Sequence, residues 1–234
     1  MTRSADIKNQ VRRLLKAPDL VFAASSWPPE LENLPAKPLF RALLSGLCAP
    51  GEDERWRAVG LLGLLAARLA GGDLDIPREV LRRLMWGLNE ESGAIVWAAP
   101  QAMGEILFQV PALALEYGRI LCSYLTSGAT FLDHPPLQAG LAWALGRLAL
   151  AAPEIVSQGG GADLLLPLLA AAQAEVRGCA AWALGVLAEP TAALALAGLT
   201  PDPAALLLLM DDSLQLSEVG KLASWAIRQC KTGS

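Results

Sequence analysis

The sequence has little charge and a single histidine, and both shortages restrict the chemistry open to it. Charged residues make up 18% of the 234 residues, and His134 is the lone histidine. A metal site built from several histidines is therefore excluded, and no Ser-His-Asp arrangement has recognisable members around this residue. We expect no catalytic residues, no metal and no cofactor.

The cysteines are few and far apart. Cys48, Cys122, Cys179 and Cys230 form no CxxC pair, and three of them fall in apolar helical stretches. This spacing favours free, buried thiols in a reducing compartment over a disulfide framework or a zinc site. The N-terminal stretch MTRSADIKNQVRRLLKAPD also lacks the apolar segment of a signal peptide, so we expect a cytoplasmic protein.

Long apolar runs are missing, although mean hydropathy is +0.38 and 53% of the residues are hydrophobic. The apolar run 204–210 is bracketed by Asp202 and Asp211, and the run 139–153 is interrupted by Arg147, whereas a membrane span needs about 20 residues. A net charge of −4 argues against a nucleic-acid partner, since binding to phosphates relies on basic patches. We expect neither a membrane nor a nucleic acid as partner.

Alternating strand patterns are almost absent, and helical periodicity dominates. Segments beginning at Glu54, Ala94, Pro136, Glu175 and Glu218 align with one another. A glycine anchors the first four, and its successive positions lie roughly 40 residues apart, a period typical of HEAT-type helical repeats. The anchor positions are Gly63, Gly104, Gly146 and Gly185, with Arg228 in the fifth segment.

Each anchored helix follows another apolar helical stretch, which gives five helix pairs over residues 36–230. The expected first helices are 38–48, 77–89, 114–127, 162–172 and 203–210. A further amphipathic helix at about 4–16 caps the stack, and an irregular lead-in reaches residue 35. The expected fold class is all-α: an α-solenoid of about five HEAT-like helix pairs plus an N-terminal capping helix, in one repeat domain spanning 1–234.

Two stretches carry a family resemblance. EVRGCAAWALGVLAE, from Glu175, is similar to the HEAT repeat of the phycobilin-lyase type, whose second helix reads roughly V-R-x-x-A-A-x-A-L-G. GLNEESGAIVWAAPQAMGEIL and FLDHPPLQAGLAWALGRLA resemble a group of uncharacterised bacterial HEAT-like proteins. The resemblance implies a HEAT-like, armadillo-like solenoid and brings no established activity.

Five tryptophans share a phase relative to the anchor. Trp56 and Trp97 stand seven residues before it, and Trp143, Trp182 and Trp225 stand three residues before it. These positions are one helical turn apart, so they form a stripe separate from the small residues of the packing face. We expect the stripe to line the concave groove of the solenoid. The alternative is that the rings fill space between successive repeats.

Polar residues accompany this stripe and complete the expected groove. The candidate binding residues are Trp56, Trp97, Gln101, Glu105, Gln138, Trp143, Arg147, Arg177, Trp182 and Trp225. A tryptophan with a charged residue one turn away can stack a planar or cationic group and fix it with a charge. The candidate rim residues are Asn89, Glu91, Asp133 and His134. Turn and capping chemistry is the competing explanation for this rim.

These features favour a non-catalytic module that binds a protein or peptide segment in its groove, as a scaffold, assembly or regulatory factor. Tryptophan and arginine are the residues most enriched in interface hot spots. The alternative is a HEAT-like enzyme. If the chain resembles the HEAT-like alkylpurine DNA glycosylases, its site would consist of Trp97, Glu105 and Trp143. If it resembles the phycobilin lyases, it would bind a tetrapyrrole. A third possibility is self-assembly into a homodimer through the apolar stretch PAALLLLMDD.

Overall fold

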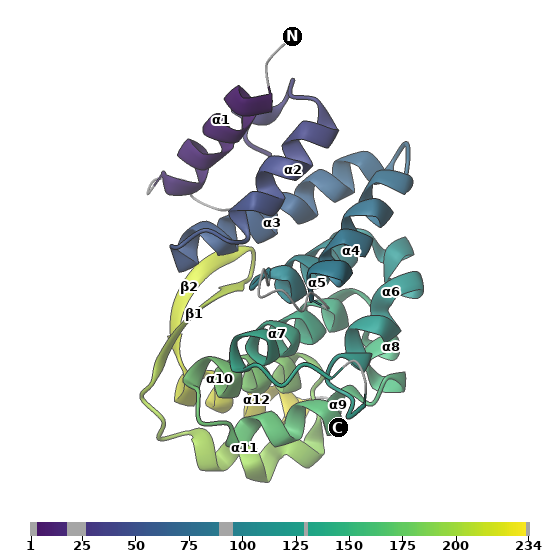
Figure 1. Cartoon of the computed structure of the whole chain (residues 1–234). Helices are drawn as coiled ribbons and strands as arrows, with labels where there is room; N and C mark the ends of the chain where they lie inside the picture. The colour runs from purple at the N-terminus through teal and green to yellow at the C-terminus, as the bar shows by residue number, and fades with distance from the viewer. Residues whose placement is uncertain (1–3, 18–26, 89–95, 129–130, 233–234) are drawn as a thin grey trace.

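The computed structural model describes residues 4–17, 27–88, 96–128 and 131–232 (Figure 1). Helices account for nearly all regular structure in these ranges. The second helices of the repeats are α3 (Glu52–Ala70), α5 (Ala99–Gln109), α7 (Pro135–Ala151), α10 (Ala174–Val186) and α12 (Val219–Thr232). The helices that precede them are α2 (Ala36–Gly46), α4 (Asp75–Leu88), α6 (Pro111–Ser123), α8 (Pro153–Gln158), α9 (Gly161–Leu165) and α11 (Ala193–Leu199). Short 3-10 turns are η1 (Pro29–Leu31), η2 (Leu166–Ala170) and η3 (Pro190–Ala192).

The second helices form one continuous row. α3 packs on α5, α5 on α7, α7 on α10 and α10 on α12. At the N-terminal end, α1 (Ser4–Lys16) packs on α2 and α3 and buries Ile7, Val11 and Leu15. The expected all-α solenoid with an N-terminal capping helix is confirmed (Figure 1).

The anchor glycines set the spacing of this row. A Cβ on Gly146 would lie 2.9 Å from the Cα of Ala183 in the next repeat, and one on Gly185 would lie 2.8 Å from the Cα of Ala226. Real Cβ atoms essentially never approach so closely, so helix meets helix through their backbones at these positions. The glycine therefore allows the close approach expected from the sequence.

One expected helix is a strand. Residues 203–210 were expected to form the first helix of the fifth pair, but Ala205–Met210 is β1, which pairs antiparallel with β2 (Ser213–Glu218). Asp211 and Asp212 have φ of 45° and 57°, the two positive values of a type I′ hairpin turn. In a short run where every residue is apolar, periodicity cannot distinguish a buried strand from a buried helix. The first helix of the fifth pair is instead α11, which packs on α12 alongside α10.

Two helix boundaries also differ from expectation. α5 begins at Ala99, with Pro100 in its first turn, so Trp97 lies in the turn before the helix and not on its stripe. The expected helix 162–172 is divided into α9 and η2, because Pro167 supplies no N–H for a continuous α-helix. Across the described ranges, the helices all fall short of the length and apolar character that crossing a membrane requires.

Replacement of Gly146 by alanine is predicted to destabilise the fold. The added methyl group meets the ring of Trp182 at 2.6 Å and the backbone of Ala183, and such overpacking costs about 1–3 kcal/mol. Gly71→Ala is the matched control, since no atom lies within 4 Å of its Cβ position and its φ is −67°. Urea unfolding of both variants measures the difference. Equal stability of the two variants would show that the helices do not meet at Gly146.

Candidate binding cleft

The β1–β2 hairpin lies across the second helices. β1 contacts α3 and α10, so it spans repeats that are far apart in the stack (Figure 1). Leu206, Leu208 and Leu209 are buried, and the side chain of Leu206 fills the space beside Gly178 on α10. The chain therefore covers this face of its own solenoid with an extended segment.

The hairpin covers the central tryptophan. Trp143 is 0% exposed, and its indole Nε1 donates a hydrogen bond of 2.9 Å to the carbonyl oxygen of Leu209 in β1. Its ring stacks on Trp182 with centroids 6.0 Å apart and meets Trp56 edge-on at 4.9 Å. The tryptophan stripe exists as expected, but at its centre it is an internal row of rings.

The rings of Trp182 and Trp225 also pack between successive repeats. Each packs against the anchor glycine of the preceding repeat, Gly146 and Gly185 respectively. Trp182 is buried and Trp225 is half-buried. The expectation that Trp143, Trp182 and Trp225 line an open groove is therefore corrected. The small neighbouring residues leave room that these rings fill.

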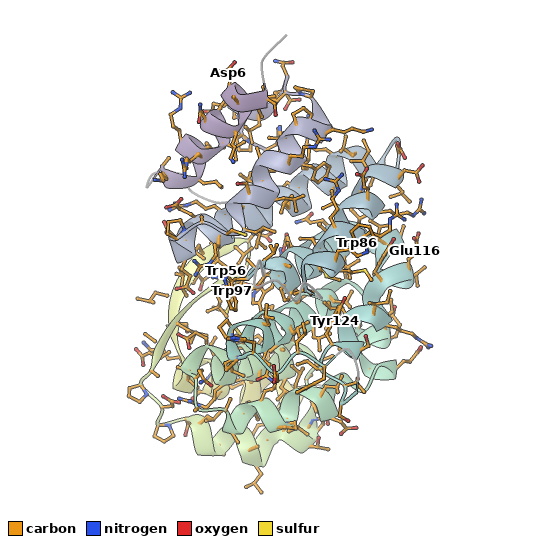
Figure 2. All side chains as sticks on the ribbon, in the orientation of Figure 1. Asp6, Trp56, Trp86, Trp97, Glu116 and Tyr124 are labelled. Carbon is orange, nitrogen blue, oxygen red and sulfur yellow. The ribbon has the colours of Figure 1, made fainter. Side chains whose placement is uncertain are left out.

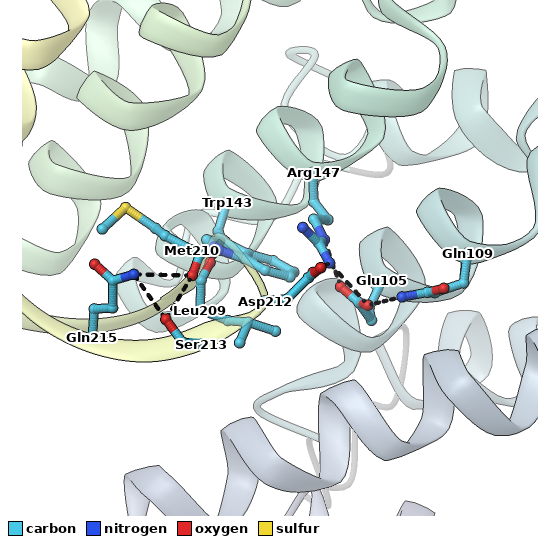
Figure 3. A network of polar contacts seen from close by, with 9 residues as sticks. All are labelled: Glu105, Gln109, Trp143, Arg147, Leu209, Met210, Asp212, Ser213 and Gln215. Atoms are coloured by element: carbon cyan, nitrogen blue, oxygen red, sulfur yellow. Dashed lines mark hydrogen bonds and ion pairs between the residues drawn. The ribbon is translucent and has the colours of Figure 1, made fainter. Parts of the chain in front are cut away.

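Glu105 and Arg147 form a buried ion pair beneath the hairpin turn (Figure 3). Arg147 Nε donates to Glu105 Oε2 at 2.7 Å, and Arg147 Nη2 donates to Asp212 Oδ1 at 2.9 Å. The guanidinium lies over the ring of Phe108, and Gln109 donates to Glu105 at 2.9 Å. Burial alone would lower the pKa of Arg147, but attraction to Glu105 and Asp212 raises it. Glu105 and Arg147, both expected to line the groove, are buried and fix the hairpin turn, so they are closed to a ligand.

Arg177 holds the other end of the hairpin. Its Nη2 donates to Asp202 Oδ2 at 2.6 Å, just before β1, and its Nη1 donates to the carbonyl oxygens of Ala171 and Ala172. The Asp202 carboxylate also accepts the backbone N–H of Ala204, and these bonds lower its pKa. Arg177 therefore stabilises the fold through these contacts and does not line the groove as expected.

A cleft of about 320 Å³ remains open beside the hairpin, at the N-terminal ends of the second helices. Three candidate residues line it: Trp56, Trp97 and Gln101. Figure 2 labels Trp56 and Trp97, which lie close together in that view. The other residues that define its wall are Glu52, Arg55, Val59, Ala98, Pro135, Pro136, Ala139, Gln173, Glu175, Val176, Cys179, Leu206 and Leu207. The cleft thus combines residues of four repeats with one strand.

Hydrogen-bond acceptors dominate the polar part of this wall. Burial raises the pKa of Glu52, an effect that Arg55 opposes and repulsion from Glu175 increases. Arg55 itself donates to the carbonyl oxygens of Ala49 and Pro50. The Oε1 atom of Gln101 is buried and has no hydrogen-bond partner among the residues the structure describes. The amide of Gln101 lies against Gly140, so the two carboxylates are the groups that fit a ligand that donates hydrogen bonds and carries positive charge.

Aromatic surface completes the cleft at its mouth. Trp97 is 38% exposed, and its ring meets the ring of His134 edge-on with centroids 5.1 Å apart. His134 precedes α7 without making a side-chain cap, and Asp133 beside it is exposed. Gln138 is half-buried and does not line the cleft. The remaining rim candidates, Asn89 and Glu91, lie outside the described residues.

The residues that sequence reasoning missed are the acidic first-turn residues and the strand. Glu52 opens α3 and Glu175 lies in the first turn of α10, so both stand further from the anchor glycine than the tryptophan stripe does. The signal in the sequence is a glutamate in the first turn of both anchored helices. Leu206 and Leu207 could not be found this way, because they reach the cleft only through the hairpin.

All four cysteines are free, as expected from their spacing. Cys122, Cys179 and Cys230 are buried, whereas Cys48 is exposed. Burial raises the pKa of Cys122 to about 11 and that of Cys179 to about 12, with repulsion from Glu175 and Glu52 adding to the shift at Cys179. These thiols stay protonated at neutral pH, so Cys179 contributes an apolar wall to the cleft.

No protein-family model and no curated protein matches this chain. Its fold does match solved structures. The designed armadillo repeat protein YIII(Dq)4CqI is 20% identical, with a TM-score of 0.55 over 98% of this chain and 95% of that one. The chain has the armadillo-like helical repeat fold.

Two further structures agree with this fold. The designed armadillo repeat protein YIII(Dq.V1)4CPAF, solved in complex with the peptide (KR)4, is 20% identical, with a TM-score of 0.55 over 94% of this chain and 98% of that one. An engineered protein from the Northeast Structural Genomics Consortium is 18% identical, with a TM-score of 0.60 over 100% of this chain and 95% of that one. At these identities the likeness describes the solenoid alone, and the resemblance to bacterial HEAT-like proteins stays a prediction.

Replacement of Arg147 by methionine is predicted to cost about 3–5 kcal/mol of unfolding free energy, because Glu105 is left buried and unpaired. Arg83→Met is the control, since Arg83 and Glu79 form an exposed pair worth about 0–1 kcal/mol. Chemical denaturation of both variants tests the difference. A loss at Arg147 no greater than that at Arg83 would rule out a stabilising role for the buried pair.

The native protein is predicted to react with iodoacetamide at Cys48 long before Cys179. The Cys179 thiol is buried, and its pKa of about 12 leaves almost no thiolate at pH 8. Peptide mass spectrometry after timed alkylation measures the order, with urea-unfolded protein as the control in which both react. Equal labelling in the native protein would mean that the wall of the cleft opens readily.

Proposed function

We propose that this chain is a non-catalytic binding module that holds a segment of a protein partner, with a lysine or arginine side chain of that segment in the cleft. The observation that carries the proposal is the composition of the cleft wall. Glu52 and Glu175 offer carboxylate oxygens as hydrogen-bond acceptors, and Trp56 and Trp97 supply aromatic surface. A cation beside carboxylates and indole rings gains both ion-pair and cation–π attraction.

The apolar side of the cleft suits the stem of such a side chain. Val59, Val176 and Leu206 line it, and lysine and arginine carry long apolar stems below their charged groups. The armadillo-like neighbour solved with the (KR)4 peptide supports the choice of a basic segment. An assembly or regulatory role for a partner in the cytoplasm follows as part of this proposal, consistent with free cysteines.

The enzyme alternative finds less support in the geometry. A glycosylase-like site would need Trp97, Glu105 and Trp143 around one open cavity. Glu105 is 0% exposed and is bound to Arg147, and Trp143 is covered by β1. The open cleft contains only Trp97 of these three residues.

Binding of the (KR)4 peptide, measured by fluorescence anisotropy, tests the proposal. Glu52→Gln and Glu175→Gln are each expected to weaken binding by about tenfold, equivalent to about 1.4 kcal/mol for one lost charge contact. Glu79→Gln is the control, because Glu79 is exposed on α4 away from the cleft. An alternating Asp-Glu peptide is expected not to bind.

The pH dependence gives a second readout. The pKa of Glu52 is raised by burial, so this carboxyl takes up its proton at a higher pH than an ordinary glutamate. A bound cation favours the ionised form, so affinity is expected to fall as the pH falls through that pKa, and the fall is expected to be smaller in Glu52→Gln. Binding that is equal in wild type and both cleft variants would refute the proposed site.

A further inference from the structure

The register of the hairpin leaves one edge of β2 open. Met210 pairs with Ser213 across a two-residue turn, so these residues exchange hydrogen bonds, and bonded pairs then alternate along the ladder. Ala204 and Val219 are also a hydrogen-bonded pair, as this alternation requires, since Val219 N donates to the Ala204 carbonyl oxygen. The N–H and C=O groups of Leu214 and Leu216 therefore point away from β1.

The opposite edge of the hairpin faces the helices. The Leu209 carbonyl points outward from β1 in this ladder, and it accepts the indole N–H of Trp143. β2 is thus the strand whose edge is turned away from the solenoid. It contains no lysine or proline, its pairing is continuous, and Leu216 is 75% exposed at its middle. Charges, prolines and bulges are the usual means of blocking such an edge, and the charge within β2 is Glu218 at its C-terminal end, so residues 213–217 carry none of these features.

The sequence of β2 is palindromic. Residues 213–217 read Ser-Leu-Gln-Leu-Ser in either direction. In an antiparallel pair of two such strands centred on Gln215, Leu214 faces the partner's Leu216, Gln215 faces the partner's Gln215, and Ser213 faces the partner's Ser217. Like side chains meet at every position, which is the self-complementarity that a two-fold interface requires.

We propose that β2 pairs with β2 of a second copy of this chain, forming a two-fold dimer with a continuous four-stranded sheet. The pairing would satisfy the outward backbone groups of Leu214 and Leu216 and cover the exposed Leu216 side chain. Asp212 and Glu218 would approach each other at both ends of the new ladder. Each already has a cation in its own chain, Arg147 and Lys221 respectively, so repulsion there is reduced.

Sedimentation velocity of the full chain tests the oligomeric state. Wild type is expected to form a dimer as its concentration rises, and Leu216→Lys is expected to remain a monomer, since a charge would stand at the centre of the sheet. Leu115→Lys is the matched control, because Leu115 is 78% exposed on α6, outside the hairpin. Circular dichroism melts of the variants show whether each stays folded. A wild-type monomer up to about 1 mM would overturn the proposal.

Cysteine cross-linking tests the register independently of stability. In a Cys48→Ser background, Gln215→Cys places two cysteines opposite each other in a non-hydrogen-bonded pair, where Cα atoms lie about 4.5 Å apart and a disulfide can form. Leu216→Cys is the control, because in this register it faces the partner's Leu214. Diamide is expected to cross-link Gln215→Cys and to leave Leu216→Cys monomeric. Cross-linking of Leu216→Cys alone, or of neither variant, would contradict pairing about Gln215.

Discussion

The close approach of successive second helices through glycine and alanine sets the geometry of the whole molecule. Where Gly146 meets Ala183 and Gly185 meets Ala226, the helix backbones touch and the repeats stack in one row. Large side chains cannot occupy those contacts, so the indole rings of Trp182 and Trp225 lie beside them, against the same glycines. Helices packed this tightly form a rigid face on which a second element can be fixed.

That second element is the hairpin, and it decides which part of the face is open. Its strand β1 buries three leucines, takes the indole hydrogen bond of Trp143, and is held at its two ends by Arg147 with Asp212 and by Arg177 with Asp202. A solenoid of this class would otherwise offer its inner face to a partner. Here the chain fills the centre of that face itself and leaves a cleft at the helix N-termini, together with the outer edge of β2.

The repeats could be predicted from the sequence because their signal is periodic and local: a recurring glycine, small residues around it and apolar helices between. The hairpin could not, since the run Leu206–Leu209 is apolar on every residue and the turn is an Asp-Asp pair, without the glycine that usually marks a type I′ turn. The prediction of the binding residues was wrong for the same reason. The phase of the tryptophans was found, but whether they face solvent depends on a segment more than sixty residues away from Trp143. Among the candidate binding residues that the structure describes, Trp56, Trp97 and Gln101 line the cleft.

Exchange of the Trp143 indole proton, followed by NMR, reports most directly on whether the hairpin closes this face. The resonance can be assigned from its loss in Trp143→Phe, and Trp86, at 79% exposed, supplies the rapidly exchanging reference. If the Nε1–H of Trp143 is bonded to Leu209 and buried, it exchanges orders of magnitude more slowly than that of Trp86. Exchange of Trp143 as fast as that of Trp86 would show instead that the hairpin leaves the solenoid face open.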